Sequence, residues 1–212
     1  MGIFNRSESR TATSTAPAPA TAAPAGAFDA GTTALADVSG QYTIDASHSH
    51  VGFSARHAMV TTVRGAFKDF EGTATVDTAN PAASSVQLTI QVASVDTGSA
   101  DRDGHLASAD FFDAATYPTI TFRSTDVQRD GSEWTVTGDL TIKDVTKPVT
   151  VVFEETGSAT DPFGNTRVGF EGEVVVNRKD WGLTWNAALE TGGVLVSEKV
   201  KLGFDVSAIR SA

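Results

Sequence analysis

The sequence predicts an all-β fold, either a closed barrel or a two-sheet sandwich, and three observations support this. From about residue 41 onward, apolar residues such as Val86, Leu88 and Ile90 alternate with polar ones. This period of two is typical of antiparallel strands with one buried and one exposed face. Turn signals such as Asn80-Pro81 separate the alternating segments, and only one segment has a helical pattern. About eight or nine such strands favour closure, because a closed sheet has no unpaired edges.

Each strand is predicted from its own alternating segment. The three earliest strands are expected at about 41–45, 49–56 and 70–77. The later strands share strict alternation and are expected at about 85–92, 119–123, 134–143, 149–153, 170–176 and 200–206. A short helical turn is expected within 101–118, capped by Ser108 or Asp110 and ended by Pro118. A second short turn is expected between His57 and Val63.

Composition excludes several classes of function. The chain has 26 acidic and 16 basic residues, and its net charge of −10 argues against a nucleic-acid partner. The absence of cysteine excludes disulfides, a thiolate zinc site and a cysteine nucleophile. No window approaches the roughly 18 apolar residues of a transmembrane helix. The first residues, MGIFNRSESR, lack the apolar stretch of a secretory signal peptide, so a cytoplasmic location is expected.

The chain divides into two parts near residue 40. Residues 1–40 are dominated by Ala, Thr, Pro, Ser and Gly, and large apolar residues are few. Such a segment cannot bury enough apolar surface to offset its ordering entropy, so it is predicted to be a disordered tail. Residues 41–212 are predicted to form the single folded domain.

The four histidines are the one group that could carry metal chemistry. His48, His50 and His57 lie close in sequence, and His105 follows later. Three neutral imidazoles can hold zinc, but no carboxylate stands at a ligand-like spacing and the His48-Ser49-His50 segment looks loop-like. No nucleophile elbow or phosphate loop is present. We therefore expect no metal, no cofactor and no catalytic residue.

Aromatic residues and strand glycines are the most informative features of the domain. Glycine inside a strand marks a bulge, a bend or a place left open for a ligand. Such glycines are Gly52, Gly72, Gly138, Gly172 and Gly203. An eight-stranded barrel has an interior that side chains can fill or that can hold one slender ligand, and the pattern alone leaves both open.

Four blocks in order resemble one family. They are YTIDASHSHVGFSARHAMVTTVRGAFKDFEGTATVD (42–77), RDGHLASADFFDAATYPTITFRST (102–125), GDLTIKDVTKPVTVVF (138–153) and NRKDWG (177–182). Together they are similar to the motifs of the YceI-like, polyisoprenoid-binding, lipocalin-like proteins. His50 stands at the family's usual serine, and Trp181 replaces a phenylalanine.

The resemblance implies a fold and a class of ligand. The fold is an extended eight-stranded antiparallel lipocalin-like β-barrel with one or two short helices. Its tunnel would bind a polyisoprenoid, such as an isoprenoid quinone or polyprenyl lipid, or a related long-chain amphiphile. The protein would act as a carrier, store or sensor without chemistry of its own. The resemblance also implies that a homodimer can form.

Two sets of residues are assigned to this tunnel. The apolar inward-facing positions are expected to line it: Phe53, Phe67, Phe70, Leu88, Ile90, Ile120, Phe122, Leu140, Ile142, Val151, Phe153, Phe170, Val174, Leu202 and Phe204. Charged residues near strand ends are expected to contact the headgroup or brace the tunnel mouth: Arg56, His57, Arg102, Asp103, His105, Arg178 and Asp180.

Two other functions compete with lipid binding. One is a metal- or acid/base-dependent enzyme in which His57, His105 and Asp103 converge. The other is a solid barrel whose acidic exterior or tail binds a protein.

Overall fold

The structure is a computed structural model that describes residues 37–190 and 192–211 of the chain. The predicted disordered tail lies outside the described residues, except for residues 37–40. The described part holds eleven strands, one α-helix and four short 3-10 helices.

The strands share an antiparallel arrangement and differ widely in length. They are β1 (Gly40–Ile44), β2 (His50–His57), β3 (Thr61–Phe67), β4 (Phe70–Val76), β5 (Ser85–Gln91), β6 (Val95–Asp96), β7 (Thr119–Asp130), β8 (Glu133–Ile142), β9 (Val145–Thr160), β10 (Thr166–Asn177) and β11 (Val196–Arg210). The helices are α1 (Ala100–Ala107) and the 3-10 helices η1 (Ala46–His48), η2 (Pro81–Ala83), η3 (Val92–Ser94) and η4 (Arg178–Trp181).

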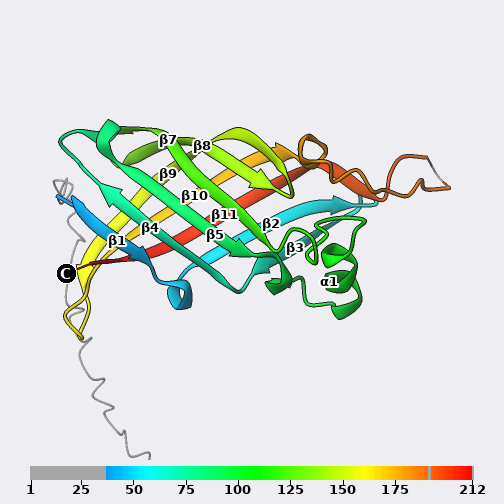
Figure 1. Ribbon diagram of the computed structural model, residues 1–212, viewed down its shortest axis with the longest axis horizontal. Helices are drawn as coiled ribbons and strands as arrows, with labels where there is room; N and C mark the ends of the chain where they lie inside the picture. The colour runs from blue at the N-terminus through cyan, green and yellow to red at the C-terminus, as the bar shows by residue number, and fades with distance from the viewer. Residues whose placement is uncertain (1–36, 191, 212) are drawn as a thin grey trace, which may run out of the picture. The chain divides into compact units, whose positions relative to one another are not determined.

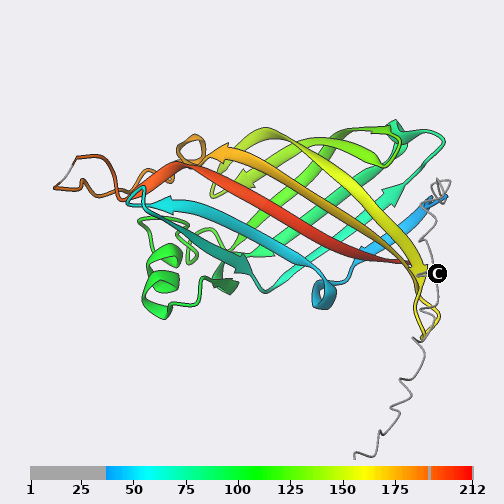
Figure 2. The same cartoon turned by 180° about the vertical axis from the view of Figure 1, so that it is seen from behind.

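Eight strands form a closed antiparallel barrel. Their order is β1-β4-β5-β7-β8-β9-β10-β11, and β1 pairs with β11 to close the ring. Tyr42 lies opposite Arg210 in this closing pair. Strands β2, β3 and β6 extend the same sheet beyond β11. Figure 1 and Figure 2 show the long strands crossing the barrel obliquely from two sides. The predicted eight-stranded barrel is confirmed.

The connections gather at two ends, which we name the α1 end and the β1 end (Figure 1). The α1 end holds α1, the β2–β3 turn and η4. The β1 end holds β1, the β7–β8 turn and the β9–β10 hairpin. Strand β11 pairs with β1 near Arg210 and with β2 from Val196 to Asp205, so β2 continues the line of β1 after η1.

One of two local expectations was wrong. The helix starts at Ala100, and Ser108 lies at its C-terminal end, where its Oγ donates to the carbonyl O of His105 (2.7 Å). The expected turn between His57 and Val63 is present at 58–60, where it forms the tip of the β2–β3 hairpin. Its tip places Ala58 and Met59 in the left-handed region, at φ of 48° and 58°, which non-glycine residues seldom occupy.

The buried apolar residues form two clusters. The cluster at the α1 end includes Val92, Phe111 and Trp181, and the cluster at the β1 end includes Tyr42 and Trp134. Val38 belongs to the second cluster and is buried. Tyr42 Oη donates to the carbonyl O of Val38 (2.8 Å), so the folded part begins a few residues before the expected boundary at 41.

The described helices are all short. None of them, in residues 37–190 and 192–211, is long and apolar enough to cross a membrane.

Candidate ligand-binding cavity

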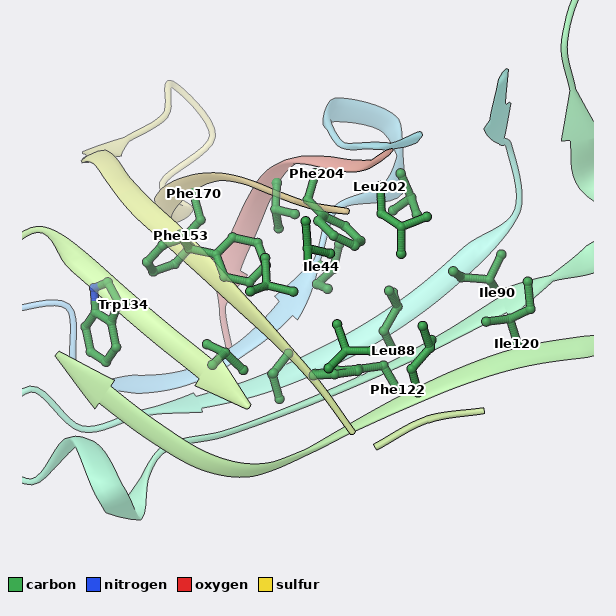
Figure 3. Close-up of a pocket in the computed structure, with 18 of the residues that line it drawn as sticks. Ile44, Leu88, Ile90, Ile120, Phe122, Trp134, Phe153, Phe170, Leu202 and Phe204 are labelled. Atoms are coloured by element: carbon green, nitrogen blue, oxygen red, sulfur yellow. The ribbon is translucent and has the colours of Figure 1, made fainter. Parts of the chain in front are cut away.

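An apolar cavity of about 200 Å³ lies inside the barrel. Its lining comes from both core clusters, with Trp134 at the β1 end and Ile90 and Ile120 at the α1 end. Figure 3 shows these side chains among the ten that it labels. The cavity volume far exceeds that of one water molecule, so the cavity has room for an apolar group.

Cross-strand pairing makes the lining continuous. Leu88 of β5 lies opposite Phe122 of β7, which lies opposite Leu140 of β8. On a strand, every second side chain points to the same face, so β8 also turns Trp134 and Val136 inward. The alternation in the sequence therefore becomes an apolar inner surface.

All but two of the predicted tunnel residues line this cavity. Those that do are Phe67, Leu88, Ile90, Ile120, Phe122, Leu140, Ile142, Val151, Phe153, Phe170, Val174, Leu202 and Phe204. Their contact with a ligand stays a prediction.

The other two, Phe53 and Phe70, are not among the lining residues. The ring of Phe53 lies over Gly65 of β3 and 5.7 Å from the ring of Phe67, between centroids. Phe70 is buried at the start of β4, opposite Ile90. Both are part of the core at the α1 end.

Several lining residues were not predicted. Trp134, Val136 and Val149 share inward strand faces with predicted residues, so the alternation could have found them. Phe112 lines the cavity from the loop after α1, where no periodic pattern exists.

Three residues with hydroxyl side chains border the lining at the β1 end, but their polar atoms contribute no surface to the cavity. They are Thr75, Ser84 and Ser85, and Thr75 pairs with Ser85 across β4 and β5. Thr75 Oγ1 donates to Gln41 Oε1 (2.9 Å), and Ser84 Oγ accepts from the amide of Asp77 (2.9 Å). The lining contains no titratable side chain among the described residues.

The charged residues predicted at the mouth lie at the α1 end, and none of them lines the cavity. Arg102 Nε donates to Thr97 Oγ1 (2.7 Å), and Asp103 Oδ1 accepts from the Thr97 amide (2.9 Å). Arg56 Nη2 donates to the carbonyl O of Met59 (2.8 Å) at the tip of the β2–β3 hairpin. These three residues brace loops.

The other predicted mouth residues differ in burial. His57 ends β2 and is exposed, and Asp180 is exposed on η4. His105 Nε2 lies 3.0 Å from Asp110 Oδ2, and the His105 ring packs edge-on against Trp185 and Phe111.

Arg178 is the exception, because it is almost completely buried. Its guanidinium donates to the carbonyl oxygens of Ser197 (3.0 Å), Val196 (3.4 Å) and Leu183. Burial disfavours the charged form and lowers the pKa of Arg178. Its partners are backbone carbonyls, so it ties η4 to the chain entering β11.

The residues of the enzyme alternative are bonded to separate partners. Asp103 is bonded to Thr97, whereas His105 is bonded to Asp110. In the described part of the chain, no group of three His, Asp or Glu side chains is placed to hold a metal ion.

The β1 end contains a buried ion pair that the sequence did not indicate. Glu155 Oε2 accepts from Arg129 Nη2 (3.1 Å) and from Trp134 Nε1 (3.0 Å). The Arg129 guanidinium also lies over the Trp134 ring, 4.7 Å from its centroid. Trp134 lines the cavity, so this pair lies directly behind the cavity wall.

A closed eight-stranded antiparallel barrel around an apolar cavity defines the lipocalin-like class of small β-barrels. Within that class, the YceI-like domain matches residues 42–208, and the chain belongs to the YceI-like family.

Curated relatives agree with this membership. Protein YceI of Escherichia coli O157:H7 is 47% identical over 158 residues, which cover 74% of this chain and 81% of the relative. Protein YceI of Salmonella newport is 44% identical over 149 residues, covering 69% and 78%.

Solved structures share the fold. BcnA of Burkholderia cenocepacia aligns with a TM-score of 0.68 at 30% identity, covering 77% of this chain and 98% of that protein. The Campylobacter jejuni YCEI protein aligns with a TM-score of 0.64 at 30% identity, covering 74% and 90%. A polyisoprenoid binding domain from Saccharophagus degradans aligns with a TM-score of 0.61 at 20% identity, covering 80% and 98%.

Proposed function

We propose that the protein binds a polyisoprenoid, or a related long-chain amphiphile, in the barrel cavity as a carrier, store or sensor. The observation that carries this proposal is the continuous apolar lining from Trp134 to Ile90. Each CH₂ buried there contributes about 0.8 kcal/mol, so a chain of a few isoprene units is retained tightly. The shared fold with the Saccharophagus degradans polyisoprenoid binding domain supports this ligand class.

The lining supports binding without chemistry. Acid/base catalysis needs a titratable group within hydrogen-bond reach of the reacting atom. The described lining residues include none.

Native mass spectrometry of the freshly purified full chain tests the proposal. We expect a discrete bound mass that extracts as a prenyl or acyl lipid. A protein that stays free of ligand even after incubation with an isoprenoid quinone contradicts the proposal.

A blocking variant locates the bound chain. Leu140→Trp fills the cavity and is expected to lower lipid affinity by roughly tenfold or more, while circular dichroism shows the fold retained. Val175→Trp, at an exposed position on β10, is the matched control and is expected to keep its lipid. A folded Leu140→Trp protein with stoichiometric lipid would show that the cavity is not the site.

A further inference from the structure

We propose that two strand glycines, Gly172 and Gly138, set the internal width of the cavity. They thereby determine the thickness of the ligand chain that the cavity accepts. They do so by letting phenylalanine rings lie against the barrel wall. This inference rests on the proposed function and adds the residues that select the ligand.

Gly172 occupies the inward face of β10 between two lining residues, Phe170 and Val174. It lies opposite Phe153 of β9 on one side and Phe204 of β11 on the other. Strands two apart in a sheet are about 9.5 Å from each other, yet the centroids of these two rings are only 5.7 Å apart. The rings meet over Gly172 because it has no side chain.

A side chain at Gly172 would displace this arrangement. A Cβ there would lie 2.6 Å from Cδ1 of Phe153 and 2.9 Å from the carbonyl O of Val152. Both distances are shorter than van der Waals contact. The Phe153 ring is the more mobile of the two groups. Because the backbones of β9 and β10 block it on the outer side, the ring would turn into the cavity.

A second glycine, Gly138 on β8, also lies beneath a phenylalanine ring. It occupies the inward face between Val136 and Leu140, both of which line the cavity. A Cβ on Gly138 would collide with Cζ of Phe122 on the neighbouring strand. The Phe122 ring therefore also rests against backbone, and both rings leave the centre of the cavity to the ligand.

The consequence is a preference for methyl-branched chains. An isoprenoid carries a methyl branch on every unit and is thicker than a straight acyl chain. One methylene group more or less on a ligand changes its relative affinity for an apolar pocket by roughly 10–200-fold. A displaced phenylalanine ring is therefore enough to exclude the thicker, branched chain.

Gly203 offers a matched control on the adjacent strand β11. It lies opposite Glu173 and Gly52, and a Cβ on it would meet no atom within 4 Å. An alanine there adds the same methyl group to the same sheet without touching a ring.

The test compares two probes, geranylgeraniol (methyl-branched) and eicosanol (unbranched), by tryptophan fluorescence titration of the full chain. Gly172→Ala is expected to weaken geranylgeraniol binding by roughly tenfold or more, and eicosanol binding much less. Adding Phe153→Leu to Gly172→Ala should restore geranylgeraniol binding, and Gly203→Ala should match the wild type. An equal loss for both probes, or no restoration in the double variant, overturns the inference.

Two measurements keep the test decisive. If Gly172→Ala does not fold, Phe153→Leu alone should raise the ratio of geranylgeraniol to eicosanol affinity, and an unchanged ratio overturns the inference. The Hα protons of Gly172 in the wild type should be shifted to high field by the Phe153 ring, which NMR measures without ligand. If the wild-type protein binds neither probe but the Gly172 signal is shifted, the proposed function fails while the placement of the Phe153 ring over Gly172 stands. An unshifted Gly172 signal overturns the inference.

Discussion

Each end of the barrel holds an arginine that is largely shielded from solvent, and the two arginines find their hydrogen-bond partners in different ways. At the α1 end, Arg178 donates to three backbone carbonyls. At the β1 end, Arg129 pairs with the buried carboxylate of Glu155, which also accepts from Trp134.

The difference shows two uses of the same side chain. Arg178 holds the irregular chain after η4 in place, and its charge is spread over backbone dipoles. Arg129 neutralises a carboxylate behind the cavity wall, and each charge there depends on the other. We therefore expect a change at the β1 end to be costly because it leaves an unpaired charge, and a change at the α1 end to act through lost hydrogen bonds.

The largest effect is expected for Glu155→Gln. It keeps the shape but leaves Arg129, whose side chain is only 13% exposed, without a counter-charge. Breaking a buried pair costs about 3 kcal/mol of unfolding free energy, which urea denaturation measures. The double variant Glu155→Leu with Arg129→Met removes both charges and should recover most of this loss. An unchanged urea midpoint for Glu155→Gln would contradict the role assigned to the pair.

A smaller effect is expected for Arg178→Lys. The charge stays, but a compact ammonium group cannot reach the separate carbonyls of Leu183 and Ser197, so about 2 kcal/mol is lost. Amide exchange should accelerate over residues 183–190. The neighbouring Lys179→Met removes only an exposed pair with Glu198 and should change stability by about 0.5 kcal/mol or less. A larger loss for Arg178→Lys than for Glu155→Gln would break the comparison of the two ends.

The smallest effect depends on pH and belongs to the β1 end. Hydrogen bonds from Ser47 and Arg167 hold the pKa of Asp45 well below its usual range, and those from Asn165 and Arg167 do the same for Asp161. A carboxyl whose folded pKa is depressed stabilises the fold above its unfolded pKa of about 4, and this contribution is lost as the pH falls further.

Arg167→Gln tests this acid dependence. It brings both pKa values closer to their unfolded values, so the variant should be less stable than wild type at neutral pH. The difference in melting temperature should shrink as the pH falls from about 4 to about 2. A difference that stays constant over this range would show that Arg167 acts without the carboxylates.

The inner surface of the barrel could be predicted because alternation reports directly on which face of a strand is buried. Leu88, Phe122 and Leu140 were found for this reason. Phe112 was missed because it lies in a loop, where burial follows tertiary contacts and leaves no period in the sequence. Glu155 was missed because a buried carboxylate on a strand looks like an exposed one until its partner is known.

Local signals indicate the turn after His57, but they indicate neither strand β3 that follows it nor the start of the helix. The β2–β3 turn uses Ala58 and Met59 in left-handed conformations, without the glycine or asparagine that marks such turns. Helix α1 starts after Ser99, which makes no side-chain cap, whereas the sequence favours Ser108 or Asp110 as the capping residue. The predicted mouth residues share a charge and an expected position near a strand end. This pattern does not distinguish residues that brace loops from residues that contact a ligand. Their headgroup role, the homodimer and the cytoplasmic location stay predictions.

The closing pair between β1 and β11 has a consequence for biosynthesis. Because Tyr42 must meet Arg210, the ring cannot close until nearly the whole domain has left the ribosome. Until then β1 and β10 expose unpaired edges, which can pair with other nascent chains. Such sequence-distant pairing also slows folding, toward milliseconds to seconds for all-β domains. The last strand of this barrel is therefore the one that protects its first strand.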